Sequence, residues 1–373
     1  MTGSIKLGKI LGIPLWLHYS WFLVLFLITS SLAIFLGELN PFWSSIERWG
    51  MALAASTMLF ASVVAHELSH SLVARRNGIS VKGITLFIFG GVAQISREAT
   101  SPRMELSIAL AGPLCSILLG FLFLCLGFAV EPFSIHLAVM MSWLFLMNIV
   151  LGVFNLIPGF PLDGGRVFRA FLWAVSGNYA RATWIATLGG KVTALGFAAI
   201  GMGIFLLERN LVQGMWMGFI GLFLWHATSA SFKQYRRRQG LQGMVARDLV
   251  STAYTEVSPE ASVRDLIDNG ALRRGQPCFV VTEDGRVSGF LNPAVVKRVA
   301  KRSRLSTRVR HVMVPLDRVA WMSPEEDSNR VLEVLDDAEL GAVPVVDGED
   351  VIGVVIREHL FGFMASHVER GRR

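Results

Sequence analysis

A short segment near residue 66 has the residue types and spacing of a metal-dependent hydrolase. It reads His66-Glu67-Leu-Ser-His70. On an α-helix, positions i and i+4 differ by about 40° around the axis, so the two imidazoles point the same way and can bind one metal ion. Glu67 lies beside that face, where a carboxylate can hold a metal-bound water. This HExxH pattern is typical of zinc hydrolases.

The alternative interpretation of this segment is structural. His66 and His70 could be hydrogen-bonded interior histidines and Glu67 a buried acid. The surrounding stretch is apolar, however, and ionisable side chains are costly there unless something compensates them. Leu or Met would fill the same volume without that cost. The pattern therefore favours a bound dication.

A catalytic zinc ion has three protein ligands and one open position, so a third ligand is expected elsewhere in the chain. The three cysteines form no CxxC pair, which leaves a carboxylate or an imidazole. Asp163 stands out, because it follows a segment rich in Pro and Gly, 155–162, and precedes Gly164-Gly165. By itself it could be an ordinary turn aspartate. Beside an HExxH segment it is the candidate third ligand.

The composition separates an apolar part from a more polar tail. Of 373 residues, 53% are hydrophobic and 17% are charged, whereas soluble domains carry about 25% charged residues. Charges are sparse from Leu11 to Trp225 and reach ordinary density from Lys233 onward. The net charge of +7 does not indicate nucleic-acid binding, because much of the excess lies beside apolar stretches. We expect a membrane part followed by a soluble tail.

Six stretches are apolar enough to cross a bilayer, which takes about 20 residues. They cover 13–36, 51–74, 104–130, 135–157, 183–207 and 211–232. With six spans both termini lie on one side, and most Lys and Arg residues between the spans lie on that same side. The positive-inside rule makes this side cytoplasmic. We expect a multi-pass protein of the cell membrane with both termini in the cytoplasm.

Residues 81–95, between the second and third spans, are rich in β-branched and aromatic residues and are broken by Gly90-Gly91. This pattern predicts a short β-hairpin. Exposed strand edges are not tolerated in hydrocarbon, so the hairpin must be covered by protein or line a wet cavity.

The tail contains two similar halves. Val257-Ser-Pro-Glu260 in the first corresponds to Met322-Ser-Pro-Glu325 in the second, an offset of about 65 residues. A helix-like stretch and two strands follow in each half, which is the scale of a β-α-β-β-α repeat.

Four elements together resemble the site-2 protease family of intramembrane metalloproteases. They are HELSH at 66–70, GGVAQ at 90–94, Ala-Gly-Pro at 111–113 and NLIPGFPLDGGR at 155–166. The tail is similar to a tandem pair of CBS (cystathionine β-synthase-type) domains. The resemblance covers nearly the whole chain. It implies a polytopic α-helical membrane protein, with about six transmembrane helices and a short membrane-embedded β-hairpin, plus a soluble α/β CBS-domain pair. The expected domains are 1–235, 244–304 and 312–368.

The resemblance also implies a role for each matching residue. One zinc ion per chain would have three ligands: His66, His70 and Asp163. Glu67 would be the general base, and Asn155 would bind substrate backbone or steady the oxyanion. The hairpin around Gly90 and Gly91 would pair with a substrate unwound into a strand, since a peptide bond inside a helix is shielded from water.

The implied activity is cleavage of membrane-anchored substrates, such as an anti-sigma factor or a membrane-tethered regulator, within their transmembrane segments and in contact with membrane lipid. For the tail the resemblance implies an adenine nucleotide, ATP or AMP, in the CBS cleft, and a homodimer through the CBS domains. The residues themselves mark no ribose or phosphate site. A purely structural or dimerising CBS pair therefore remains the alternative.

Two competing functions belong to other classes. A transporter or channel gated by the tail would show charges in several spans or broken half-helices in two repeats, whereas the polar residues here converge on one metal-like cluster. A catalytically silent scaffold would not need three ligands and a base.

Overall fold

The computed structural model describes residues 3–360 except 89, 240–243, 252–254, 269–277, 284, 338–340, 349 and 358–359. The chain folds as two compact units, Met1–Phe232 and Lys233–Arg373, called the membrane unit and the tail below. The predicted limits 1–235, 244–304 and 312–368 stay predictions, because several of them border or include residues outside the described part.

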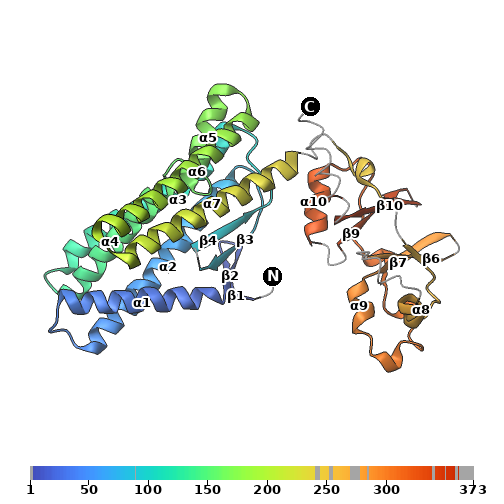
Figure 1. Cartoon of the computed structure of the whole chain (residues 1–373), viewed down its shortest axis with the longest axis horizontal. Coiled ribbons are helices and arrows are strands. Elements are labelled where there is room, and N and C mark those ends of the chain that lie inside the picture. Colours follow the sequence, from blue (N-terminus) through green and yellow to red (C-terminus); the bar gives the residue numbers. More distant parts are fainter. Residues whose placement is uncertain are drawn as a thin grey trace. The chain divides into compact units, whose positions relative to one another are not determined.

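Long apolar helices dominate the membrane unit (Figure 1). Within the described residues, five helical segments are long and apolar enough to cross a membrane: Ser20–Leu39 (α1), Ser45–Arg76 (α2), Pro102–Val130 (α3), Ile135–Asn155 (α4) and Tyr179–Glu208, which comprises α6 (Tyr179–Gly203) and a π-helical turn. Side-chain caps start most of them. Ser44 and Glu47 form a capping box at α2, and Ser101, Ser134 and Asn178 cap α3, α4 and α6.

The first predicted span, 13–36, is wrong at its start. Ile13–His18 forms strand β2, and helix α1 begins only at Ser20. Along β2 the side chains alternate between buried and half-buried, the two-residue period of a strand. Pairing with neighbouring strands determines the secondary structure of this segment, because β2 lies between two other strands of a sheet.

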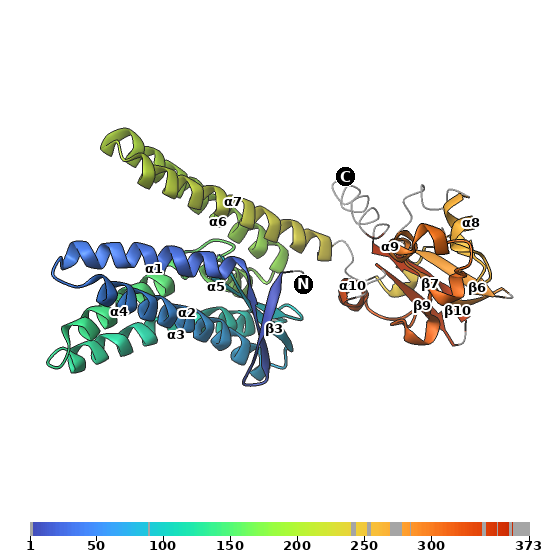
Figure 2. The same cartoon turned by 90° about the horizontal axis from the view of Figure 1, so that it is seen from below.

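The sixth predicted span, 211–232, lies within helix α7 (Leu211–Gln239), which is not among the five membrane-length segments. The six-span count therefore stays a prediction. Helices α6 and α7 form a close hairpin (Figure 2), where Gly201 and Gly214 bring the two backbones together. Lys191, a charged residue near the middle of α6, lies 5.2 Å from the centre of the Trp225 ring of α7, an arrangement that stabilises a cation.

The predicted hairpin at 81–95 is confirmed as a pair of antiparallel strands, β3 (Val81–Phe87) and β4 (Gly90–Ile95). It belongs to a four-stranded sheet that the sequence did not reveal. The strand order is β1-β2-β3-β4, where β1 is Ser4–Ile10, and β2 pairs with β3 in parallel. The apolar face of this sheet packs on Val63, Val64 and Leu68 of α2. The hairpin thus lies beside the HExxH segment, while its depth in a membrane stays a prediction.

Helix α5 (Asp163–Ser176) is the short helix between α4 and α6, and it packs against α3 and α6. The connection from α4 to α5, residues 156–162, is an irregular loop. A Cβ atom on Gly164 or Gly165 would collide with the backbone of this loop. The two glycines therefore allow the start of α5 to press directly on the loop, which fixes where the first residue of the helix lies.

The tail repeats one arrangement twice. The first half has strands β5 (Thr255–Val257), β6 (Phe279–Glu283) and β7 (Arg286–Leu291) with helices α8 (Val263–Asp268) and α9 (Pro293–Arg298). The second has helix α10 (Ser328–Asp337) and strands β9 (Ala342–Asp347) and β10 (Asp350–Ile356). Strand β8 (Val314–Pro315) pairs with β7. The helix-like stretch predicted in each half begins at Ser262 or Ser328 and was expected to reach residue 272 or 338, which lies outside the described residues.

Each half of the tail opens with a segment that packs in the core of the other half. Ala246 and Leu249, ahead of the first half, are buried against Met322 and Val345 of the second. Val309, ahead of the second half, is buried with side chains of the first. Backbone hydrogen bonds link the same segments: Ala246 N donates to Glu326 O, and Val309 N donates to Ala261 O. The two halves therefore share their cores.

Candidate metal centre

The two histidines lie on the buried face of α2, one helical turn apart. Their exposed fractions are 3% for His66 and 4% for His70. Both rings turn the Nε2 atom to the same point, and these two atoms are 3.2 Å apart. The predicted shared face is therefore present, and it points into the protein.

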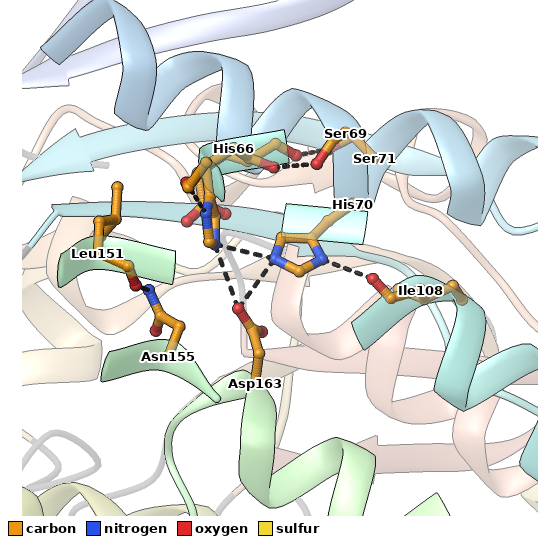
Figure 3. Close-up of polar contacts among 10 residues, drawn as sticks. His66, Ser69, His70, Ser71, Ile108, Leu151, Asn155 and Asp163 are labelled. Atoms are coloured by element: carbon orange, nitrogen blue, oxygen red, sulfur yellow. Dashed lines mark hydrogen bonds and ion pairs between the residues drawn. The ribbon is translucent and has the colours of Figure 1, made fainter. Parts of the chain in front are cut away.

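Asp163 reaches the same point from another part of the chain (Figure 3). It is the first residue of α5. Its Oδ2 atom lies 3.2 Å from His66 Nε2 and 3.1 Å from His70 Nε2. The structure thus brings together the three candidate ligands across 97 residues of sequence.

The three ligand atoms form a triangle that fits zinc. Its edges are 3.2, 3.2 and 3.1 Å. Ligands 2.0–2.1 Å from a tetrahedral zinc lie about 3.3–3.4 Å apart, so the observed edges need almost no adjustment. Two imidazoles and a carboxylate also form a common donor set for a catalytic zinc. The residues present fit the metal that the HExxH pattern predicts.

Helix α3 orients both imidazoles. His70 Nδ1 lies 2.6 Å from the carbonyl oxygen of Ile108, and His66 Nδ1 lies 2.8 Å from Ser116 Oγ. A carbonyl oxygen only accepts, so His70 Nδ1 carries a proton. In the neutral ring, Nε2 then presents its lone pair toward His66 and Asp163. Such lone pairs repel one another unless a cation or a proton lies between them. Hydrogen bonds from the other ring nitrogen, Nδ1, to a neighbouring group are typical of metal-bound histidines.

Gly112 of α3 allows this close approach. A Cβ atom at position 112 would lie only 2.5 Å from His66 Nε2, and it would collide with His70 Nε2 as well. Sequence reasoning gave no role to Gly112 or Ser116. Gly112 was visible only as part of the Ala-Gly-Pro element of the resemblance, and a serine in an apolar span carries little signal.

Glu67 lies on the side of α2 that faces the hairpin. The backbone of β4 lies directly against its side chain at Gly91. A Cβ atom on Gly91 would lie 3.1 Å from the Glu67 carboxyl carbon and closer still to its Cγ. Gly91 therefore leaves room for the acid, whereas Gly90 serves the turn, since its φ of +118° suits glycine.

Asn155 is the last residue of α4, just before the loop that leads to Asp163. Its amide nitrogen donates to the carbonyl oxygen of Leu151 at 3.0 Å. An amide nitrogen carries two hydrogens, so this bond uses half of its donor capacity. Figure 3 shows the side chain beside the three candidate ligands but directed at its own helix.

Apolar helices that bury two imidazoles and hold a half-buried carboxylate and a neighbouring glutamate define a membrane protein of the zinc hydrolase class. The model of peptidase family M50 matches residues 54–139 and 131–197, and that of the CBS domain matches 309–366. The chain is 35% identical over 363 residues to Rip3 of Mycobacterium tuberculosis, which is named as a zinc metalloprotease, and the match covers 95% of this chain and 91% of the relative. The chain belongs to peptidase family M50, the site-2 protease type of zinc metalloprotease.

Two further proteins are similar. A zinc metalloprotease of Methanocaldococcus jannaschii is 29% identical over 367 residues, which is 98% of this chain and 97% of the relative. The solved structure of a site-2 protease from the same organism is 34% identical, with a TM-score of 0.41, and covers 61% of this chain and 94% of that one. The predicted protease class and the predicted CBS relationship of the tail are confirmed.

Proposed function

We propose that the chain is an intramembrane endopeptidase in which His66, His70 and Asp163 hold one zinc ion and Glu67 is the general base. The observation that carries this proposal is the triangle of three ligand atoms with edges of 3.1–3.2 Å. Zinc, when bound, supplies a Lewis acid that lowers the pKa of a water molecule and polarises a carbonyl group.

Glu67 moves the proton. Glu67 is adjacent in sequence to His66, and its side chain lies against the backbone of β4. There it accepts a proton from the attacking water and later delivers it to the leaving amine. Asn155 uses its second amide hydrogen for the substrate backbone or for the oxyanion of the tetrahedral intermediate.

The substrate binds as an added strand on β4. This strand is last in the sheet order, and among the described strands only β3 pairs with it. The close approach of Gly91 to the Glu67 side chain supports this binding mode, because it brings β4 next to the proposed base. A peptide that joins this edge gains main-chain hydrogen bonds, and its extended form exposes the carbonyl groups that a helix would shield.

The proposed substrates are single-span membrane-anchored proteins of the anti-sigma factor or membrane-tethered regulator kind. The M50 relationship and the five membrane-length segments support this class. We also propose that both termini are cytoplasmic, which the distribution of Lys and Arg supports. For the tail we propose adenine-nucleotide binding, with a structural or dimerising CBS pair as the competing role.

Metal analysis of the purified full chain tests the proposal. Wild-type protein is expected to hold about one zinc per chain, because the triangle presents a single set of ligands. Asp163→Ala removes one ligand and should lose most of the zinc. Glu67→Gln should keep the zinc but lower cleavage of a reconstituted single-span substrate by about 100- to 10,000-fold, the usual contribution of a general base.

The two variants act as controls for each other, since one removes the metal and the other spares it. A Glu67→Gln protein with full peptidase activity would refute the mechanism. Zinc retained at wild-type affinity after loss of Asp163 would refute the ligand assignment.

A further inference from the structure

A second buried polar cluster lies beside the candidate metal centre, on the same helices. Arg169 of α5 is 8% exposed and Glu105 of α3 is completely buried. Arg169 Nε donates to Glu105 Oε1 at 2.7 Å, and Nη2 donates to the same oxygen. Neither residue entered the sequence-based site, although a lone acid at the start of an apolar span is a signal of function.

The guanidinium of Arg169 is enclosed by two aromatic rings. Its central carbon lies 5.0 Å from the centre of the Phe160 ring and 4.7 Å from that of Tyr179. Phe160 belongs to the loop before Asp163, and Tyr179 is the first residue of α6. The Tyr179 hydroxyl in turn donates to Glu98, ahead of α3, at 2.5 Å. Arg169 therefore joins α3, the loop, α5 and α6.

Glu105 lies on the same stripe of α3 that orients the histidines. Ile108, Gly112 and Ser116 contact the two imidazole rings, and Glu105 precedes Ile108 by three residues, about 4.5 Å along the helix axis. One face of α3 thus contacts both imidazoles and, through Glu105, the Arg169 side chain of α5. The helix that carries Asp163 is held to the helix that orients His66 and His70.

Stability alone is a weak reason for such a pair. A buried ion pair loses the hydration of both charges, and apolar residues of similar volume often stabilise a protein at least as well. The second oxygen of Glu105, Oε2, is buried and accepts no hydrogen bond from any residue that the structure describes. The ion pair instead fixes the orientation of the Arg169 side chain, because a planar guanidinium held by a carboxylate and two rings has one orientation.

We propose that Arg169 is a positioning residue for Asp163, acting through Glu105 to fix α5 on α3. This inference rests on the proposed function, in which Asp163 is a zinc ligand. Asp163 is the first residue of α5 and Arg169 lies six residues later on the same short helix. A rotation or slide of α5 would move the carboxylate away from both imidazoles.

The test measures zinc affinity by chelator competition, together with kcat and KM, on the full chain in detergent. Arg169→Met, which keeps much of the length but removes the charge and the donors, is expected to weaken zinc binding by about 10- to 100-fold, as loss of an outer contact does. It should lower kcat with little change in KM. Arg169→Lys keeps the charge without the planar fork and should restore part of the affinity.

The matched control is Arg181→Met, which removes an exposed arginine of α6 and should leave zinc binding unchanged. A merely structural role for Arg169 would lower the thermal midpoint and leave the zinc affinity of the folded protein as it was. Arg169→Met with wild-type zinc affinity and kcat would therefore overturn the inference.

If Arg169→Met does not fold, Glu105→Gln gives the answer. It keeps the shape and the accepting oxygen while removing the charge, and it should weaken zinc binding by a smaller factor. Wild-type affinity in Glu105→Gln would then overturn the inference. Wild-type protein that binds no zinc would overturn the proposed function as well, whereas zinc-loaded wild type with unaffected variants would overturn only the role of Arg169.

Discussion

The membrane unit and the tail bury different kinds of side chain. In the membrane unit, histidines, an acid, an arginine and an asparagine are buried among apolar helices: His66, His70, Glu105, Arg169 and Asn148. In the described part of the tail, the buried polar side chains are two serines, Ser262 and Ser328, at the starts of α8 and α10. Ser262 accepts a hydrogen bond from the backbone of Asp265, as a helix cap does.

This difference distinguishes the unit that holds the candidate metal centre from the tail. Buried ionisable groups are costly unless they are paired or bind a metal, and in the membrane unit they form two clusters along one face of α3. The described part of the tail has apolar cores shared between its two halves. We therefore expect substitutions in the tail core to change stability and those around α3 to change metal binding, and three experiments test this separation.

The largest expected effect is on the stability of the tail. Phe290 of β7 is 1% exposed and packs with Ala342, Val354 and Ile356 of the second half. Phe290→Ala should lower the local free energy of unfolding by about 3–5 kcal/mol, because it leaves a cavity between the halves. Hydrogen exchange of peptides from β6 to β10 measures the change. Zinc content should stay at the wild-type level, and a parallel loss of zinc would contradict the separation.

The next effect concerns two glycines of the membrane unit. Gly112→Ala places a methyl group against both Nε2 atoms, so the imidazoles must move apart and zinc affinity should fall by about 100-fold, or about 2.7 kcal/mol. Gly196→Ala in α6 is the control, because a Cβ atom there has nothing within 4 Å. It should bind zinc normally and unfold at the same or a slightly higher temperature, since alanine favours helix more than glycine. Equal zinc affinity in the two variants would refute the role of Gly112.

The smallest effects compare two buried serines, one from each unit. Ser116→Ala removes the hydrogen bond to His66 Nδ1 and should weaken zinc binding by about tenfold, the lower end for such outer contacts. Ser262→Ala removes the cap of α8 and should cost about 1 kcal/mol of local stability without changing zinc binding. Chelator competition and hydrogen exchange on both proteins complete the comparison. Loss of zinc in Ser262→Ala would contradict the expectation that substitutions in the tail leave metal binding unchanged.

Local patterns were sufficient to locate most of the candidate site. His66, Glu67 and His70 lie within one turn of helix, so the helical period alone places two imidazoles on one face. The repeat in the tail and the hairpin at 81–95 were likewise visible, because identical spacings and a Gly-Gly turn are local features. The M50 relationship follows from the same short elements.

Long-range packing determined the features of the fold and of the candidate site that local patterns did not reveal. The sequence suggested Asp163 as the third ligand. Its carboxylate reaches both histidines because Gly164 and Gly165, which lack a Cβ atom, let the start of α5 pack directly on the preceding loop. The apolar residues 13–18 suit either a helix or a strand, and pairing with β1 and β3 selects the strand. Gly112, Ser116, Glu105 and Arg169 acquire their roles from partners 42 to 64 residues away. Hydropathy and local period carry no information about contacts across such distances, so these roles appear only when the helices are packed.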